Sequence, residues 1–178
     1  YGTRRIVLSA ERDTRRDLFD PKLGSDVVGT VEIAGGALQG STNFQKWSGS
    51  ASLYRPSGRR ATLALRIRGG YERPFGKVPS ATATRLDLIP VDDRFRTGGA
   101  TSVRGYFENE IGYRNGKIRG GAILIVGNAE LRFPLIWVVS GAVFVDGGNV
   151  WERGEDITLK LLFTIAGGDA GSSDMRYT

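Results

Sequence analysis

Apolar and polar residues alternate with a period of two along most of the chain. In residues 61–71, leucine, isoleucine, glycine and tyrosine occupy every second position, and threonine, alanine and arginine occupy most of the positions between them. This alternation predicts a β-strand with one apolar and one polar face. The same pattern predicts strands at 4–14, 26–34, 44–55, 61–71, 120–133, 138–148 and 157–166. The predicted fold class is therefore all-β, with antiparallel strands.

Proline and glycine mark the connections between these strands. The segments DPKLG (20–24) and PSG (56–58) each contain a proline that presets φ and a glycine that tolerates positive φ, so each is expected to close a hairpin. Residues 72–95 contain three prolines and break the alternation, which predicts a long loop with at most a short strand at 83–89. Pro134 is expected to end the strand at 120–133.

Two kinds of protein contain strands of this type. A soluble sandwich or ligand-binding barrel buries the apolar faces, whereas a transmembrane barrel turns them towards lipid and its polar faces towards a lumen. The predicted strands are about ten residues long, as a tilted membrane-spanning strand requires. Residues 175–178 are typical of the start of another strand, and an open sheet edge cannot lie in hydrocarbon. The membrane interpretation therefore requires the 178 residues to be part of a larger barrel.

The composition narrows the chemistry. The chain contains no cysteine and no histidine, which excludes disulfides, thiolate nucleophiles, imidazole bases and histidine-ligated metals within it. We therefore expect no catalytic residue, cofactor or metal site, although chemistry by two carboxylates stays open. A net charge of +6 is compatible with binding to nucleic acid, but no basic cluster is interleaved with stacking aromatics. Basic residues that line a lumen or face anionic surfaces are therefore favoured over a nucleic-acid partner. Asp92 and Asp93 lack further oxygen ligands for Ca²⁺ and are expected to be exposed loop charges.

One cation and two carboxylates form the main candidate for a functional contact. Arg104 lies in the glycine-rich stretch FRTGGATSVRGY (95–106), and Asp146 lies within an apolar strand. Parity places Glu130 on the polar face of the neighbouring strand. An arginine fork can donate to two carboxylates at once, which would tuck the loop into a barrel. The alternative is a solvated Arg104 and an Asp146 that begins a turn with the Gly-Gly-Asn after it.

Three ordered motifs resemble the C-terminal barrel of the BamA/TamA outer-membrane assembly proteins, the bacterial surface antigen superfamily. They are RFRTGGATSVRGY (94–106), GNAELRFPL (127–135) and GAVFVDGGNVW (141–151). The segment ERDTRRDLFDPKLG (11–24) resembles a strand and short periplasmic turn of that family, and KVPS (77–80) resembles the segment before its long loop. The resemblance implies that residues 1–178 are an incomplete part of a sixteen-stranded transmembrane β-barrel, whose long loop at about 90–119 folds inward. The periplasmic repeat domains and the terminal barrel strands would then be absent.

The resemblance also implies a loop clamp. Its residues are Val103, Arg104, Gly105, Tyr106, Glu130, Phe144, Asp146 and Gly148. Arg104 would contact Asp146 of the F-x-D-x-G motif and Glu130, and Tyr106 replaces the phenylalanine that some members carry.

The implied function is the non-enzymatic insertion of β-barrel or autotransporter substrates through a lateral seam of a barrel in the bacterial outer membrane. The implied partners are unfolded outer-membrane proteins, outer-membrane lipids including lipopolysaccharide, and periplasmic or lipoprotein accessory subunits. A two-partner secretion porin, the barrel anchor of a fused lipase and a passive outer-membrane channel are the alternatives.

Overall fold

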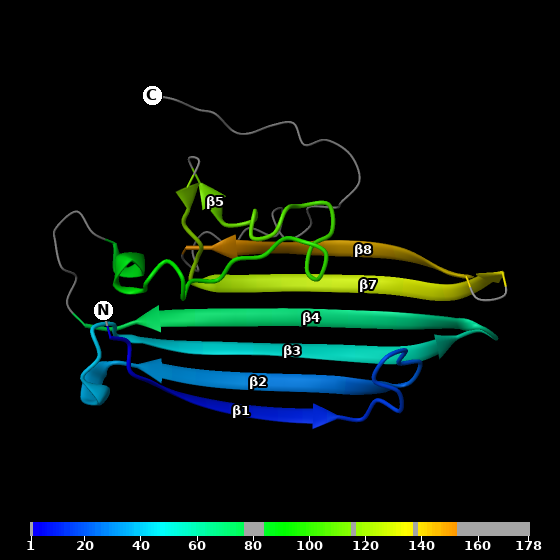
Figure 1. The fold of residues 1–178 in the computed structure, drawn as a ribbon, viewed down its shortest axis with the longest axis horizontal. Coiled ribbons are helices and arrows are strands. Elements are labelled where there is room, and N and C mark those ends of the chain that lie inside the picture. The colour runs from blue at the N-terminus through cyan, green and yellow to red at the C-terminus, as the bar shows by residue number, and fades with distance from the viewer. Residues whose placement is uncertain (1, 77–83, 115–116, 137–138, 153–178) are drawn as a thin grey trace.

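Six long antiparallel strands form one sheet in chain order (Figure 1). The computed structural model describes residues 2–76, 84–114, 117–136 and 139–152. The strands are β1 (Arg5–Asp13), β2 (Gly24–Ala34), β3 (Phe44–Ser57), β4 (Ala61–Pro74), β7 (Ile123–Ile136) and β8 (Val139–Trp151). The six predicted strands between residues 4 and 148 are confirmed. The predicted strand at 157–166, the strand start at 175–178 and the KVPS motif at 77–80 lie outside the described residues.

Two of the connections lie at one end of the sheet (Figure 1). One contains the 3-10 turn η1 (Gly36–Leu38) and joins β2 to β3. The other joins β4 to β7 and contains the 3-10 turn η2 (Arg85–Leu88) and a small hairpin of β5 (Tyr113–Arg114) and β6 (Lys117–Ile118). We call this second connection the long loop. The connection between β1 and β2 and the turn between β3 and β4 lie at the opposite end.

One local prediction can be made more exact and another was wrong. The loop predicted to hold at most a short strand at 83–89 has no strand in its described residues 84–89 and forms the turn η2 there. Thr84 and Asp87 make a capping box: the Thr84 N–H donates to Asp87 Oδ2 over 2.7 Å, and the Thr84 hydroxyl over 2.9 Å. Pro134 does not end its strand, because β7 continues to Ile136. The pairing with β8 shifts register between Pro134 and Ile136, and such an irregularity accommodates a residue that lacks an N–H donor.

The long loop covers the polar face of the sheet, and nothing among the described residues covers the apolar face. On the apolar face, large side chains are exposed, including Ile67 at 59% and Val143 at 63%. The polar face carries the long loop, and the buried cluster between them consists of Phe95, Val103, Leu124, Val126 and Val150. A bare apolar face beside a covered polar face is typical of a membrane barrel wall and unusual in a soluble domain. Among the described residues, no helix is long and apolar enough to cross a membrane.

Candidate loop-clamp site

The long loop folds back on itself before it reaches the sheet. Phe95 and Thr97 form isolated antiparallel bridges with Gly121 and Ile111. Gly98 has φ of 113°, and a Cβ added there would lie 2.5 Å from the carbonyl oxygen of Phe107, so only glycine fits. These contacts turn the chain sharply and present residues 102–104 to the sheet.

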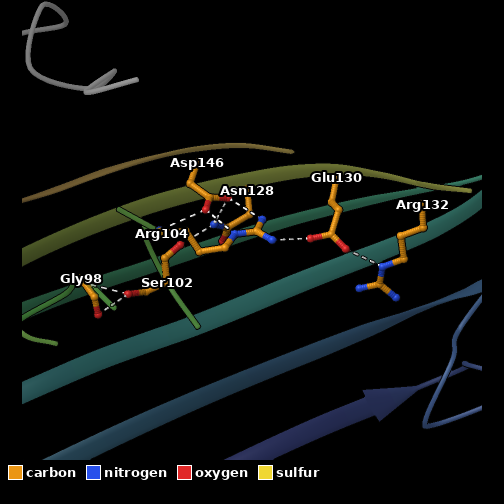
Figure 2. Close-up of polar contacts among 7 residues, drawn as sticks. All are labelled: Gly98, Ser102, Arg104, Asn128, Glu130, Arg132 and Asp146. Carbon is orange, nitrogen blue, oxygen red and sulfur yellow. Dashed lines mark hydrogen bonds and ion pairs between the residues drawn. The ribbon is translucent and has the colours of Figure 1, made fainter. Parts of the chain in front are cut away.

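A serine closes the turn next to the clamp. The Ser102 hydroxyl donates to the Gly98 carbonyl over 2.7 Å and accepts from the Gly98 N–H over 3.0 Å (Figure 2). Ser102 is buried, so these hydrogen bonds are shielded from water. The turn therefore holds Arg104, two residues later, in a defined position.

Arg104 contacts two carboxylates and one aromatic ring. Its Nε and Nη2 donate to the two oxygens of Asp146 over 2.6 and 2.9 Å, and its Nη1 donates to Glu130 over 2.6 Å (Figure 2). The Arg104 backbone N–H adds a fourth bond, to Asp146 over 3.1 Å. Its Cζ lies 3.5 Å from the centroid of the Phe144 ring, within cation–π range. One guanidinium thus joins the long loop to both β7 and β8.

The pairing of β7 with β8 explains why these groups meet. Asn128 lies directly opposite Asp146, and Glu130 lies directly opposite Phe144. Side chains two residues apart on a strand share a face, so all four project from the same side of the sheet. The parity prediction for Glu130 and Asp146 therefore corresponds to the observed geometry. The alternative, in which Asp146 begins a turn and Arg104 is solvated, is wrong, because Asp146 lies within β8 and its side chain is fully buried.

The clamp balances its charges. Arg132 Nε donates to Glu130 over 2.6 Å, so two arginines face two carboxylates. Asn128 Nδ2 donates to Asp146 over 2.9 Å and also to the carbonyl of Ser102. The hydrogen bond to Asp146 raises the pKa of Arg104 above its ordinary value, so Arg104 stays charged at every accessible pH.

The remaining predicted residues pack around this contact. Val103 is fully buried in the cluster beneath the loop, and Tyr106 packs against it. Gly105 has φ of 97°, a conformation that favours glycine. A Cβ at Gly148 would lie 2.8 Å from Val126 Cγ2, so this position has no room for a side chain.

Three residues of the site were missed by the sequence prediction: Ser102, Asn128 and Arg132. Two of them had a signal, because Asn128 and Arg132 share the parity of Glu130 and flank it on β7. Ser102 had none, because its role depends on how the long loop turns.

One cluster of three carboxylates has the spacing of a metal site. Carboxylate oxygens of Glu11, Asp13 and Asp26 lie within 4.8 Å of one another, but Arg15 pairs with Asp13 at 2.7 Å and approaches Asp26 at 4.0 Å. This group is therefore compensated by a guanidinium.

Of the two adjacent loop aspartates, Asp92 is exposed, as predicted. The prediction was wrong for Asp93, whose carboxylate pairs with Arg5 at 3.0 Å. This ion pair could not be expected from the sequence, because the partners are 88 residues apart.

Comparison with known proteins gives three findings. A model of the Omp85 superfamily domain matches residues 1–163. A SAM50-like protein of Schizosaccharomyces pombe is 36% identical over 129 residues, which are 70% of this chain and 25% of that protein. The sorting and assembly machinery component 50 homolog of Mus musculus is 31% identical over 69% of this chain and 24% of its own length. This chain thus spans about a quarter of these curated relatives.

The third finding is structural. The crystal structure of BamA from Haemophilus ducreyi lacking POTRA domains 1–3 matches with a TM-score of 0.66 and 19% identity, over 83% of this chain and 30% of that one. This likeness establishes a common fold, in which the sheet described above corresponds to part of a barrel wall.

Proposed function

This chain belongs to the Omp85 superfamily, and from that membership we propose that the full-length protein inserts β-barrel or autotransporter substrates into an outer membrane. Residues 1–178 are proposed to form part of its sixteen-stranded barrel, with the long loop in the lumen. The printed name of the mouse relative, a sorting and assembly machinery component, supports this proposal. The bacterial outer membrane is the proposed location, because the motifs resemble those of bacterial assembly proteins.

One observation carries the proposal: Arg104 binds the long loop to the polar face of β7 and β8 while the apolar face stays bare. Lipid would cover the apolar face, and the loop would occupy the interior. The clamp residues are proposed to hold the loop and the barrel shape, without a catalytic role. We expect the fixed loop to keep the shape of the barrel while its seam opens.

The proposed mechanism is non-enzymatic. An incoming substrate strand pairs with an exposed strand edge at the lateral seam, which supplies backbone partners that the lipid cannot supply. The partners are unfolded outer-membrane proteins, outer-membrane lipids including lipopolysaccharide, and accessory periplasmic or lipoprotein subunits. Strand pairing alone provides the driving contact, so the mechanism needs no cofactor.

The test uses the full-length protein in liposomes and a urea-denatured outer-membrane barrel protein as substrate. Insertion is measured as the heat-modifiable folded form on a gel. We expect faster folding than in empty liposomes and a loss of this acceleration in Arg104→Ala. The exposed Arg85 of the same loop offers a matched control, and Arg85→Ala should retain the activity.

Two of the alternatives, the passive channel and the secretion porin, predict different outcomes in this assay. A passive channel gives large steady conductance in planar bilayers and no acceleration of folding. A secretion porin moves its substrate across the bilayer, so the substrate is found free inside the liposome. Either result in place of insertion would overturn the proposal.

A further inference from the structure

A second group of charges lies on the polar face of the sheet, on strands that the clamp does not touch. Lys46 of β3 lies directly opposite both Glu32 of β2 and Glu72 of β4, so charges of alternating sign form a row across three strands. Lys46 Nζ lies 2.6 Å from Glu72 Oε1, and the Glu72 side chain is fully buried. The buried Glu72 carboxylate is stabilised by the Lys46 ammonium, because a buried charge without a partner is strongly destabilising.

The row binds residues 93–95 of the long loop, which we call its base because they lie before the tip that carries Arg104. Lys46 Nζ donates to the carbonyl of Asp93 and lies 4.3 Å from the centroid of the Phe95 ring. Arg5 Nη1 of β1 joins Glu32 at 2.8 Å to the Asp93 carboxylate at 3.0 Å. The polar contacts of Asp93 therefore reach Arg5 of β1 and Lys46 of β3, whereas those of Arg104 reach β7 and β8.

Phe95 covers the ion pair because the strand below leaves room for it. A Cβ added to Gly70 of β4 would lie 2.3 Å from Phe95 Cζ, so any larger residue there would push the ring away. Phe95 is only 8% exposed. The ring excludes water from the Lys46–Glu72 pair, which strengthens the electrostatic attraction.

We propose that Lys46 and Glu72, with Phe95 and the Asp93 carbonyl, form a base anchor that holds residues 93–95, the base of the long loop, independently of the Arg104 clamp. The ion pairs of the two attachments share no residue and lie on different strands, so their contributions should add. Phe95 and Val103 meet in one buried cluster, and any departure from additivity should arise there. When Arg104 releases β7 and β8, the base anchor keeps residues 93–95 in place. The tip of the loop can then move while its base remains on the sheet.

The energetics identify Lys46 as the residue to change. Within the described residues, Glu72 Oε2 is buried without a hydrogen-bond partner, so Lys46 provides the closest compensation for this carboxylate. Removing Lys46 alone leaves an uncompensated buried charge, whereas removing both charges does not. Lys46→Met should therefore loosen the base more than the double variant Lys46→Met/Glu72→Gln.

The experiment places a spin label at the base or at the tip of the loop in the full-length protein. The 178 residues contain no cysteine, so Asp92→Cys and Thr101→Cys provide single labels here once cysteines elsewhere in the protein are replaced. Both side chains are exposed, so labels fit without repacking. The mobile fraction of each label is measured in liposomes, and heat-modifiable mobility on a gel verifies that each variant is folded.

We expect a crossed pattern. Lys46→Met should raise the mobile fraction at residue 92 at least about tenfold, which corresponds to about 1.4 kcal/mol, and leave residue 101 unchanged. Arg104→Ala should do the reverse, and the combined variant should show both effects. Lys46→Arg, which retains the cation, should keep the base immobile, as should the control Lys22→Met in an exposed pair at the other end of the sheet.

Two results would overturn the base anchor. In one, Lys46→Met leaves residue 92 immobile; in the other, each variant mobilises both labels equally, which would mean that the loop detaches as one unit. If Lys46→Met fails to fold, the Lys46→Met/Glu72→Gln variant still tests attachment at residue 92. The mobile fractions of the two labels measure attachment of the long loop to the sheet. They therefore do not depend on whether the protein inserts substrates.

Discussion

Replacement of Arg104 by alanine is the most direct perturbation of the loop clamp. It removes the three side-chain hydrogen bonds to Asp146 and Glu130 and the contact with the Phe144 ring. The bond from the backbone N–H of residue 104 to Asp146 can remain. The variant therefore weakens attachment of the loop without changing the strands.

The free-energy cost of Arg104→Ala depends on which hydrogen-bond donors Asp146 and Glu130 keep in the variant. Breaking a buried ion pair costs roughly 3–5 kcal/mol. Arg104 is 27% exposed, and each carboxylate keeps another donor, Asn128 for Asp146 and Arg132 for Glu130. We therefore expect the lower end, about 3 kcal/mol, which is roughly a 100-fold rise in the population of released loop. Arg104→Lys keeps the charge but loses the planar fork, so about half of this cost is expected.

The assay is proteolysis of the full-length protein in liposomes under native conditions, with a protease of broad specificity. When the loop reopens and closes faster than it is cut, the cleavage rate reports the population of released loop. Mass spectrometry of the fragments identifies cuts between residues 97 and 111. The matched control is Arg85→Ala, which removes an exposed arginine from the same loop and should change the rate by less than about twofold.

One result would refute the reasoning about the clamp. If Arg104→Ala is cleaved between residues 97 and 111 as slowly as the unmodified protein, the three hydrogen bonds do not hold the loop. Equal cleavage of the Arg104→Ala and Arg85→Ala variants, both faster than the unmodified protein, would also refute it, because the effect would then not depend on the carboxylates.

Three further predictions concern the surroundings of the clamp. Gly148→Ala places a Cβ 2.8 Å from Val126 Cγ2, so overpacking should cost about 1–3 kcal/mol and lower the thermal unfolding temperature of the barrel. Asn128→Ala removes a donor from the buried aspartate of the clamp and should raise loop cleavage by about tenfold, or about 1.4 kcal/mol. The pKa of Asp87 is lowered by hydrogen bonds from the N–H and hydroxyl of Thr84, so its stabilisation of η2 is present above the ordinary aspartate pKa of about 3.9 and is lost as the pH falls below it. Hydrogen exchange at residues 84–89 should show this loss, and Asp87→Asn should abolish the pH dependence.

Clear outcomes would contradict these predictions. An unchanged unfolding temperature in Gly148→Ala would mean that β8 can shift away from β7 at this point. Unchanged cleavage in Asn128→Ala would mean that Arg104 alone satisfies Asp146. Hydrogen exchange at residues 84–89 that is the same at pH 3 and pH 6, after correction for the intrinsic rate, would exclude a role for the capping box.

The strands and their faces could be predicted from the sequence because the side-chain period of a strand is geometric. Parity alone placed Glu130 and Asp146 on polar faces of neighbouring strands, and the hairpin between them determined that those faces adjoin. Prediction was incomplete or wrong where local chemistry competes with alternation. At residues 84–88 a capping box outweighs the apolar pattern, and at Pro134 a register irregularity lets the strand continue.

What the tertiary structure alone decided is where the long loop lies. The partners of Asp93 and Phe95 are on β1, β3 and β4, and nothing in the local sequence of the loop specifies Arg5, Lys46 or Gly70 as neighbours. Strand alternation is local because each residue determines the side of the next one. The position of a loop on a sheet is not local, because it depends on how all the strands beneath it pair and on which of them leave space, as Gly70 does for the Phe95 ring.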